Sequence, residues 1–253
     1  MSSSKRVFRP TLWPTLFTIP CVLIMIGLSI WQVQRLHWKE GLIADRQSRV
    51  AASPIDLPPV GSDLGDAEYR RVRLIGQFQH DHEMYLAARS MNGNVGYHIV
   101  TPMVLNAGGT VLVDRGWVPE TKKLPDSRPQ GQLTGEVTMD GVVRLSQHQS
   151  FMQPDNEPDK NVWFFLDLPA MVAKAGLQAR SDIYVEAAAG NIPGTYPLGG
   201  QTRINLPNDH LQYAITWGLL AGALIVIYVI YHLRSPIEPG TQPTSVQPPS
   251  QER

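Results

Sequence analysis

Two long runs without a charged residue, one near each end of the chain, constrain the fold more than any other feature. The first extends from Thr11 to Gln34 and the second from Leu211 to Tyr231. As helices that rise about 1.5 Å per residue, both can cross a hydrocarbon core of roughly 30 Å. A helix of a soluble domain rarely stays apolar on every side for this length. The sequence therefore predicts two transmembrane helices in a lipid bilayer.

A cleaved signal peptide is the alternative interpretation of the first run. The apolar region of such a peptide covers only about 7–15 residues and ends at a site between small residues. The run here is longer, and Trp31, Gln32 and Arg35 stand at its end instead of such a site. We therefore expect a retained anchor.

Basic residues predict the orientation. Lys5, Arg6 and Arg9 precede the first span without an acidic residue, which favours a cytoplasmic N-terminus, although Arg35 and Lys39 beyond the span weaken the argument. Two spans place both termini on one side. The expected organisation is a cytoplasmic tail (1–10), a span (11–34), a periplasmic domain (35–209), a second span (210–233) and a disordered cytoplasmic tail rich in Pro, Ser and Gln (234–253).

Short stretches with strand-like patterns fill the central region. They cover 70–78, 83–90, 97–105, 110–119, 136–146 with an interruption at Asp140–Gly141, and 182–190, with a shorter one from Trp163. Gly76 suggests a bulge or a close approach of backbone. Pro169 and Gly176 fit the first turn and the stop of a short helix. This spacing predicts a mostly antiparallel β domain, as a small barrel or a sandwich, with one helix.

Composition excludes several classes of function. Lys and Arg together number 22, as do Asp and Glu, so the chain lacks the basic excess that nucleic-acid binding requires. The single cysteine, Cys21, permits no disulfide within the chain and no zinc site built on cysteines. No nucleophile elbow, phosphate-binding loop or H-E-x-x-H motif is present. We therefore expect a protein that is not an enzyme.

Three polar features of the central domain are weaker candidates. His80 and His82 could touch a metal from one face of an extended segment, but a solvated turn is the favoured interpretation. Asp114–Arg115 could form a polar site, whereas a local ion pair at the end of a strand is more common. His98 and His148 have no obvious partner and are expected to be structural.

His210 stands at the entry to the second span and is the strongest candidate. His210, Tyr213 and Trp217 follow the i, i+3, i+7 spacing of one helix face. Beside them, small residues recur at every fourth position, at Ala214, Gly218 and Gly222. A neutral imidazole above a groove of small side chains could ligate the iron of a flat apolar macrocycle, which the aromatic side chains would cover.

The alternative is a hydrated His210 in an interfacial aromatic belt, with the small residues packed against Gly27 of the first span. In that span, Trp31, Arg35 and Trp38 share a face, with Lys39 adjacent. Snorkelling of the basic side chains is the default expectation, and pairing with haem propionates is the alternative. His37 is conceivable as a second axial ligand.

Several blocks, taken in order, resemble the surfeit locus protein 1 family, the assembly factors of cytochrome c oxidase. The resemblance covers residues 12 to about 233. The blocks are WQVQRLHWKEGLI after the first span, YRRVRLIGQF, VLVDRGWVP, DGVVRLS and HLQYAITW at the start of the second span.

This resemblance implies a bacterial inner-membrane protein that helps to mature subunit I of the oxidase, with haem a synthase as a further partner. Bacterial members are described as binding haem a through the histidine at the head of the second span, which corresponds to His210. Asp114 replaces the usual Asn before RGW, Gly218 follows Trp217 where an aromatic residue is common, and His37 matches no family histidine.

The leading hypothesis is therefore a haem a chaperone with His210 as the iron ligand and Tyr213 and Trp217 lining the ring. The second is a scaffold that holds subunit I without haem and uses the RGWVP strand and its surroundings as its contact surface. The third is a membrane-bound enzyme, for which the sequence offers no constellation.

Overall fold

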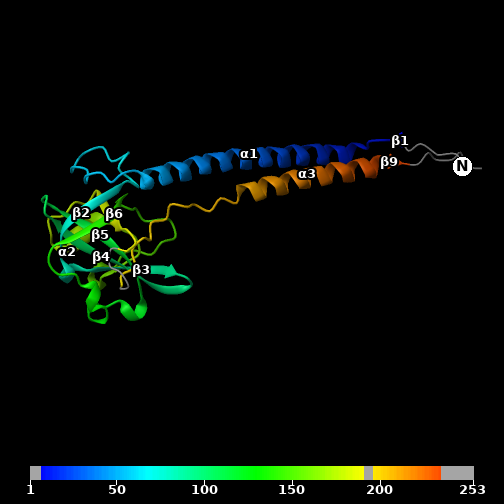
Figure 1. Cartoon of the computed structure of the whole chain (residues 1–253). Coiled ribbons are helices and arrows are strands. Elements are labelled where there is room, and N and C mark those ends of the chain that lie inside the picture. Colours follow the sequence, from blue (N-terminus) through cyan, green and yellow to red (C-terminus); the bar gives the residue numbers. More distant parts are fainter. Residues whose placement is uncertain (1–6, 191–195, 235–253) are drawn as a thin grey trace, which may run out of the picture. The chain divides into compact units, whose positions relative to one another are not determined.

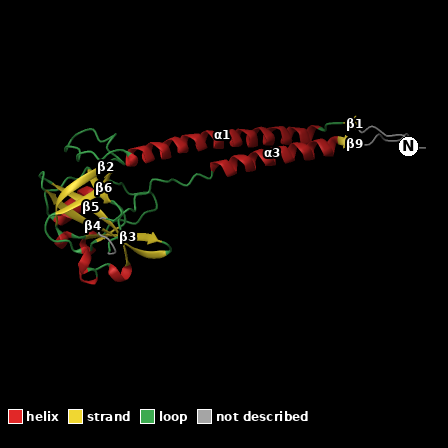
Figure 2. Ribbon diagram, viewed as in Figure 1, coloured by secondary structure: helices red, strands yellow, loops and turns green. Residues whose placement is uncertain are grey.

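The computed structural model describes residues 7–190 and 196–234 (Figures 1 and 2). Two compact units make up the chain. One combines Met1–Gly41 with Pro207–Arg253 and is a helix pair, and the other, Leu42–Leu206, is a β domain. Apart from their innermost residues, the two cytoplasmic tails expected from the sequence lie outside the described residues.

Helices α1 (Leu12–Ala51) and α3 (His210–His232) contain the two apolar runs. Both are long and apolar enough to cross a membrane, and only 6% and 11% of their apolar stretches are buried within the protein. Such bare apolar surface is stable in lipid, where helices satisfy their own backbone hydrogen bonds. At the end of the pair, β1 (Val7–Phe8) pairs with β9 (Leu233–Arg234) in antiparallel fashion.

Helices α1 and α3 lie side by side (Figure 1), and their shielded residues recur at alternating steps of three and four. Along α3 these residues are Ala214, Trp217, Ala221, Leu224 and Tyr228, and along α1 they include Met25, Ser29, Gln32, Leu36 and Lys39. An average step of 3.5 residues is typical of helices that cross at about 20°. The helix pair therefore packs along a heptad seam.

The stripe of small residues expected at every fourth position does not form the helix contact, which follows the heptad seam instead. Ala214 lies in the seam, but further along the helix Ala221 is buried whereas Gly222 has nothing within 4 Å of an added Cβ. A fourth-residue stripe drifts away from a 3.5-residue seam. The expected packing against Gly27 is wrong, because nothing lies near its Cβ position and Ser29 reaches Gly218 instead.

Polar side chains within the seam fix the register of the two helices. Four hydrogen bonds cross it: between the Thr11 hydroxyl and His232 Nε2 (2.9 Å), between the Thr15 and Tyr228 hydroxyls (2.6 Å), from the Ser29 hydroxyl to the Ala214 carbonyl (2.8 Å), and between His210 Nδ1 and Gln32 Oε1 (2.6 Å). Polar groups that face lipid seek such partners. Sliding one helix by a turn would break all four together.

The β domain is built on one sheet of seven strands in the order β2-β6-β8-β5-β4-β3-β7. All neighbours are antiparallel except the parallel pairs β5–β8 and β3–β7. The mostly antiparallel β domain predicted from the sequence is confirmed. The strands are β2 (Arg71–Phe78), β3 (Met84–Met91), β4 (Asn94–Leu105), β5 (Thr110–Pro119), β6 (Val137–Leu145), β7 (Val162–Trp163) and β8 (Ile183–Ala187).

Gly76 marks the corner at which β2 passes from one pairing to another. The strand pairs with β6 from Arg71 to Gly76 and with β4 from Gly76 to Phe78. A Cβ at Gly76 would lie 2.0 Å from the Val104 carbonyl oxygen, so the close approach expected from the sequence is confirmed. Strands that change partners in this way make the corners of sandwiches, and a sandwich fits the sheet better than a closed barrel.

Strand β5 lies at the centre of the sheet and is buried on both faces. Val111 and Val113 contribute to one apolar cluster together with Val185, and Leu112 contributes to a second together with Tyr184. Alternate side chains point to opposite faces of a strand. The two apolar clusters therefore form the core on either side of β5.

The short helix α2 (Leu168–Ala175) follows the sequence prediction. Asp167 caps its start by accepting a hydrogen bond from the Ala170 amide, and Gly176 ends it at a φ of 64°. The interruption expected at Asp140–Gly141 is wrong, because β6 continues through both residues. Gly141 instead gives room for β8, since a Cβ there would lie 2.3 Å from a Val185 methyl group. Single 3₁₀ turns, such as η1 (His80–His82), complete the domain.

Candidate functional site

His210 is the first residue of α3, and its imidazole is held across the seam by Gln32. The distance from His210 Nδ1 to Gln32 Oε1 is 2.6 Å, and Gln32 is only 9% exposed. Because an amide oxygen only accepts hydrogen bonds, Nδ1 is the donor of this pair, and in the neutral form of the ring Nε2 carries the lone pair. No described residue donates to Nε2. The ring is thus oriented, with one nitrogen satisfied and the other available.

One aromatic side chain, from the other helix, contacts this histidine. Trp31 of α1 meets the imidazole edge-on, with 6.4 Å between ring centroids and an angle of 81°. Trp217 lies in the seam and is half-buried, whereas Tyr213 is 53% exposed. The structure therefore brings Trp31 to His210. Tyr213 and Trp217 differ in environment, since the first is exposed and the second is half-buried in the seam. That the latter two line a ligand stays a prediction.

The basic residues of α1 next to the site are partly engaged. The Arg35 guanidinium stacks over the Trp38 ring at 3.8 Å from its centroid, a cation–π contact. Lys39 donates to the Pro207 carbonyl oxygen. His37 is exposed on α1 and has no described contact with His210. It therefore gains no support as a second ligand.

The candidate pair His80 and His82 lies in η1, which is a 3₁₀ turn and not an extended segment. His80 Nε2 lies 2.8 Å from the Leu133 carbonyl oxygen, and its Nδ1 lies 3.4 Å from Glu83 Oε1. Both nitrogens of His80 thus have protein partners. Within the described parts of the chain, no group of three His, Cys, Asp or Glu side chains could hold a metal ion.

Glu83 is the centre of a buried ionic network that the sequence did not reveal. Arg115 donates to it at 3.0 Å and Arg128 donates to both of its oxygens, with all three side chains at most 2% exposed. Burial alone would raise the pKa of Glu83, but hydrogen bonds from His80 and Arg128 and the two arginine charges hold it at about 2. Burial lowers the pKa of Arg115 to about 10, against the attraction of Glu83.

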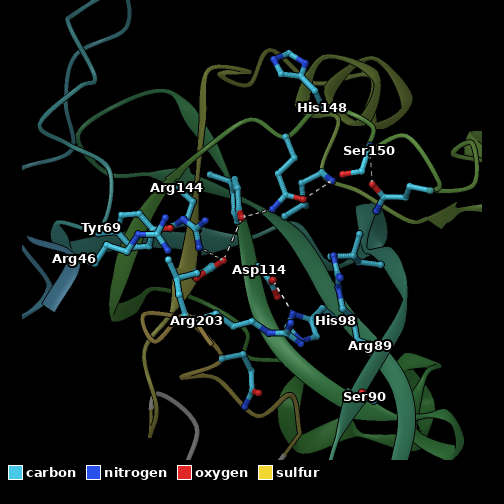
Figure 3. A pocket seen from close by; sticks show the side chains of 18 residues that line it. Arg46, Tyr69, Arg89, Ser90, His98, Asp114, Arg144, His148, Ser150 and Arg203 are labelled. Atoms are coloured by element: carbon cyan, nitrogen blue, oxygen red, sulfur yellow. Dashed lines mark hydrogen bonds and ion pairs between the residues drawn. The ribbon is translucent and has the colours of Figure 1, made fainter. Parts of the chain in front are cut away.

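The local ion pair expected for Asp114–Arg115 is wrong. Neighbouring residues of a strand point to opposite faces, so Arg115 joins Glu83 while Asp114 lies 2.8 Å from His98 Nδ1. The second Asp114 oxygen accepts from the Gly116 amide at 3.0 Å. His98, for which the sequence indicated no partner, is thus a paired residue on the wall of a polar cavity (Figure 3).

The RGWVP segment, to which the scaffold hypothesis gave a contact role, is mostly buried. Arg115 is 3% and Trp117 5% exposed. Trp117 nevertheless borders a surface hollow, together with the half-buried Pro119 at the end of β5. A contact surface here would therefore consist mainly of the surroundings of the strand, and this part of the hypothesis stays a prediction.

Gln32 is the site residue that sequence reasoning missed. A signal existed, because a glutamine inside an uncharged run needs a hydrogen-bond partner in the membrane. The only polar side chains near the corresponding depth of the second span are those around His210. Pairing the two runs in antiparallel order would have brought Gln32 and His210 together.

The fold and the site together define a membrane-anchored β domain whose helix pair carries an oriented histidine. Residues 19–222 match the family model described as the SURF1 family. The chain is 39% identical to Surfeit locus protein 1 of Mus musculus over 227 residues, which is 83% of this chain and 73% of that protein. It is also 39% identical to the Homo sapiens protein over 225 residues (82% and 74%) and 36% identical to a SURF1-like protein of Drosophila melanogaster over 241 residues (88% and 77%).

The chain belongs to the SURF1 family. This is a family of cytochrome c oxidase assembly factors, and its role implies association with the oxidase complex.

Proposed function

We propose that this chain binds haem a at His210 and assists its insertion into subunit I of cytochrome c oxidase. The proposal adds a cargo and a ligand to the family's general role in oxidase assembly. It requires an imidazole that is neutral, oriented and accessible at the edge of the membrane.

The observation that carries the proposal is the hydrogen bond between His210 Nδ1 and Gln32 Oε1, at 2.6 Å. Histidines that ligate metals almost always donate their other N–H group to an acceptor, which orients the ring and raises the basicity of the ligating nitrogen. Gln32 has this role here, and Nε2 is left without a partner in the described chain. A bound haem would supply an iron that accepts the Nε2 lone pair.

The neighbourhood of His210 suits a flat apolar ring. Ala214 and Gly218 carry little side chain, and only the Ser29 hydroxyl, at 3.7 Å, lies near the Cβ position of Gly218. The exposed Tyr213 and the half-buried Trp217 offer aromatic surfaces beside this strip. They would shield the ring from water and lipid headgroups without adding a second ligand.

A single protein ligand is consistent with delivery. No other described histidine contacts His210, so the chain itself offers one strong bond to iron. Haem held by one bond and by apolar contacts can be released to an acceptor that offers more. On this proposal the acceptor is subunit I, haem a synthase is the donor, and the β domain lies on the periplasmic side of the inner membrane.

The test is to purify the full chain from cells that make haem a and to record its absorption spectrum. We expect a haem spectrum from the wild type and from His37→Ala, and at least a tenfold loss of bound haem in His210→Ala. His37 is the matched control because it is an exposed histidine on the other helix of the pair. Full haem content in His210→Ala, or colourless wild-type protein, would overturn the proposal.

A further inference from the structure

The β domain contains a polar cavity that the proposed function does not use. Its volume is about 520 Å³, and its walls come from the strands around β5 and from the loops beside them (Figure 3). Cavities that bind small molecules usually measure about 300–1,000 Å³. All residues that line it belong to the β domain, so it is a separate site from His210.

The cavity has more positive than negative charge. Four arginines line it, Arg46, Arg89, Arg144 and Arg203, against two carboxylates, Asp114 and Glu186. An arginine is never deprotonated at neutral pH, so these four charges are permanent.

Both carboxylates already have partners. Asp114 is bound by His98 and by the Gly116 amide. Glu186 Oε1 accepts from Arg144 at 3.1 Å and from the Tyr184 hydroxyl at 3.2 Å. Neither carboxylate forms an ion pair with Arg89 or Arg203, although both attract Arg89 from a distance.

Two of the arginines also have partners of their own. Arg46 and Arg144 stack on the Tyr69 ring, at 4.8 and 4.5 Å from its centroid, and their side chains gather around it in Figure 3. By contrast, Arg89 and Arg203 have no carboxylate partner in the described parts of the chain. These two side chains, of which Arg89 is half-buried and Arg203 is exposed, are the unmatched charges of the cavity.

The backbone is shaped to present Arg89. The pairing of β3 with β4 shifts register between Leu86 and Arg89, and Ala88 in this bulge has a φ of 55°. This left-handed conformation is unfavourable for alanine. Bulges redirect side chains and are common beside functional sites. Burial lowers the pKa of Arg89, and Arg203 lowers it further against the attraction of Asp114.

A second unmatched group is an acceptor. Glu186 Oε2 is buried and has no hydrogen-bond partner, although Oε1 of the same carboxylate has two. A buried acceptor without a donor is costly. A ligand that carries a hydroxyl group would satisfy it.

We propose that this cavity binds a small hydroxylated organic anion, whose carboxylate or phosphate group pairs with Arg89 and Arg203 and whose hydroxyl group donates to Glu186. Guanidinium groups bind both kinds of oxyanion in bidentate fashion. Such a ligand matches both unmatched charges and the unmatched acceptor at once.

Calorimetric titration of the full chain in detergent at low salt tests this proposal. The probes are citrate, glycerol 3-phosphate and tricarballylate, which is citrate without its hydroxyl group. We expect saturable binding of citrate or glycerol 3-phosphate, about tenfold or more weaker in Arg89→Gln and in Arg203→Gln. If citrate binds, tricarballylate should bind more weakly. Arg73→Gln is the control of equal charge, because Arg73 lies outside the cavity and pairs with Asp140.

The melting temperature of each variant is compared with that of the wild type, to check that the variant is folded. Arg89→Lys retains the charge and should retain part of the affinity, which separates loss of the site from loss of the fold. The proposal is overturned if neither hydroxylated probe binds saturably, or if Arg89→Gln and Arg203→Gln bind as tightly as Arg73→Gln.

Discussion

The helix pair and the β domain handle polar side chains in opposite ways. Along the helix seam, polar groups are few, and each contacts one partner on the other helix, as Gln32 contacts His210. In the β domain, charges gather in clusters, such as Glu83 with Arg115 and Arg128. The seam uses neutral pairs because charge is costly in lipid. The domain can bury charge because ions of opposite sign lie in direct contact, as the Glu83 carboxylate does with two arginines.

The two regions also differ in the kind of polar group that they leave without a partner. In the helix pair, His210 Nε2 has no partner among the described residues, and it is the atom that we propose as a ligand for haem iron. In the β domain, the unmatched groups of the cavity are two cations, Arg89 and Arg203, and one acceptor, Glu186 Oε2, which together suit a hydroxylated anion from water. The Glu83 network leaves only a single donor atom, Arg115 Nε, without a partner among the described residues, and its arginines are held by Glu83, so we interpret it as structural.

The largest expected effect comes from removing the carboxylate of that network. Glu83→Ala leaves Arg115 and Arg128 buried without a counter-charge, which typically costs about 3–5 kcal/mol. Urea unfolding followed by tryptophan fluorescence measures the loss. Glu68→Ala is the control, because Glu68 is 31% exposed in its pair with Arg144 and should cost about 1 kcal/mol or less. Equal losses in the two variants would show that Glu83 has no special role.

Glycine substitutions compare the packing of the two regions. Gly76→Ala places a methyl group 2.0 Å from the Val104 carbonyl oxygen and should cost about 3 kcal/mol through overpacking. Gly222→Ala meets nothing within 4 Å, so the same change in the helix pair should leave stability unchanged. Thermal unfolding of both variants tests this contrast, and a stable Gly76→Ala would contradict the corner in β2.

The pH dependence of stability should also follow Glu83. Its pKa is lowered from 4.5 to about 2 on folding, so the stabilisation is present above pH 4.5 and is lost as the pH falls toward 2. The full difference corresponds to roughly 3 kcal/mol. Urea midpoints between pH 7 and pH 3 should fall steeply in the wild type and less steeply in Glu83→Gln. Parallel curves would refute the ionic role of this residue.

The smallest of these effects concerns the orientation of His210. Gln32→Leu removes the acceptor of Nδ1 and should weaken haem binding about 10–100-fold, as is typical for partners of metal-bound histidines. The measurement is haem content of the purified chain. Gln34→Leu is the matched control, because Gln34 is exposed on the same helix. If both variants keep full haem, Gln32 does not position the ligand.

Much of the fold could be predicted from the sequence because its signals are local. Uncharged runs mark α1 and α3, alternation marks the strands, and Pro169 with Gly176 delimits α2. The interruption expected at Asp140–Gly141 failed because a local turn signal was outweighed by packing. Gly141 is small to admit β8, a contact between segments distant in the sequence.

The site could be predicted only in part, for the same reason. His210 could be chosen as a candidate because its neighbours in the sequence are also its neighbours on the helix. Gln32 is distant in the sequence from His210, and only the pairing of the two helices brings them together. The cavity arginines are likewise distant from one another in the sequence, and the fold of the β domain brings them together. The contacts of Glu83 with Arg115 and Arg128 likewise could not be predicted, because the three residues are distant in the sequence and meet only in the folded domain.

The most direct test of the central claim replaces the ligand atom without removing the ligand. In His210→Met, a thioether sulfur would take the place of Nε2, and the absorption spectrum of the purified haem-bound chain should shift, because the axial ligand sets the electronic properties of the iron. The account predicts a variant that retains some haem a with displaced absorption maxima. A spectrum identical to that of the wild type, at full haem content, would contradict ligation by His210.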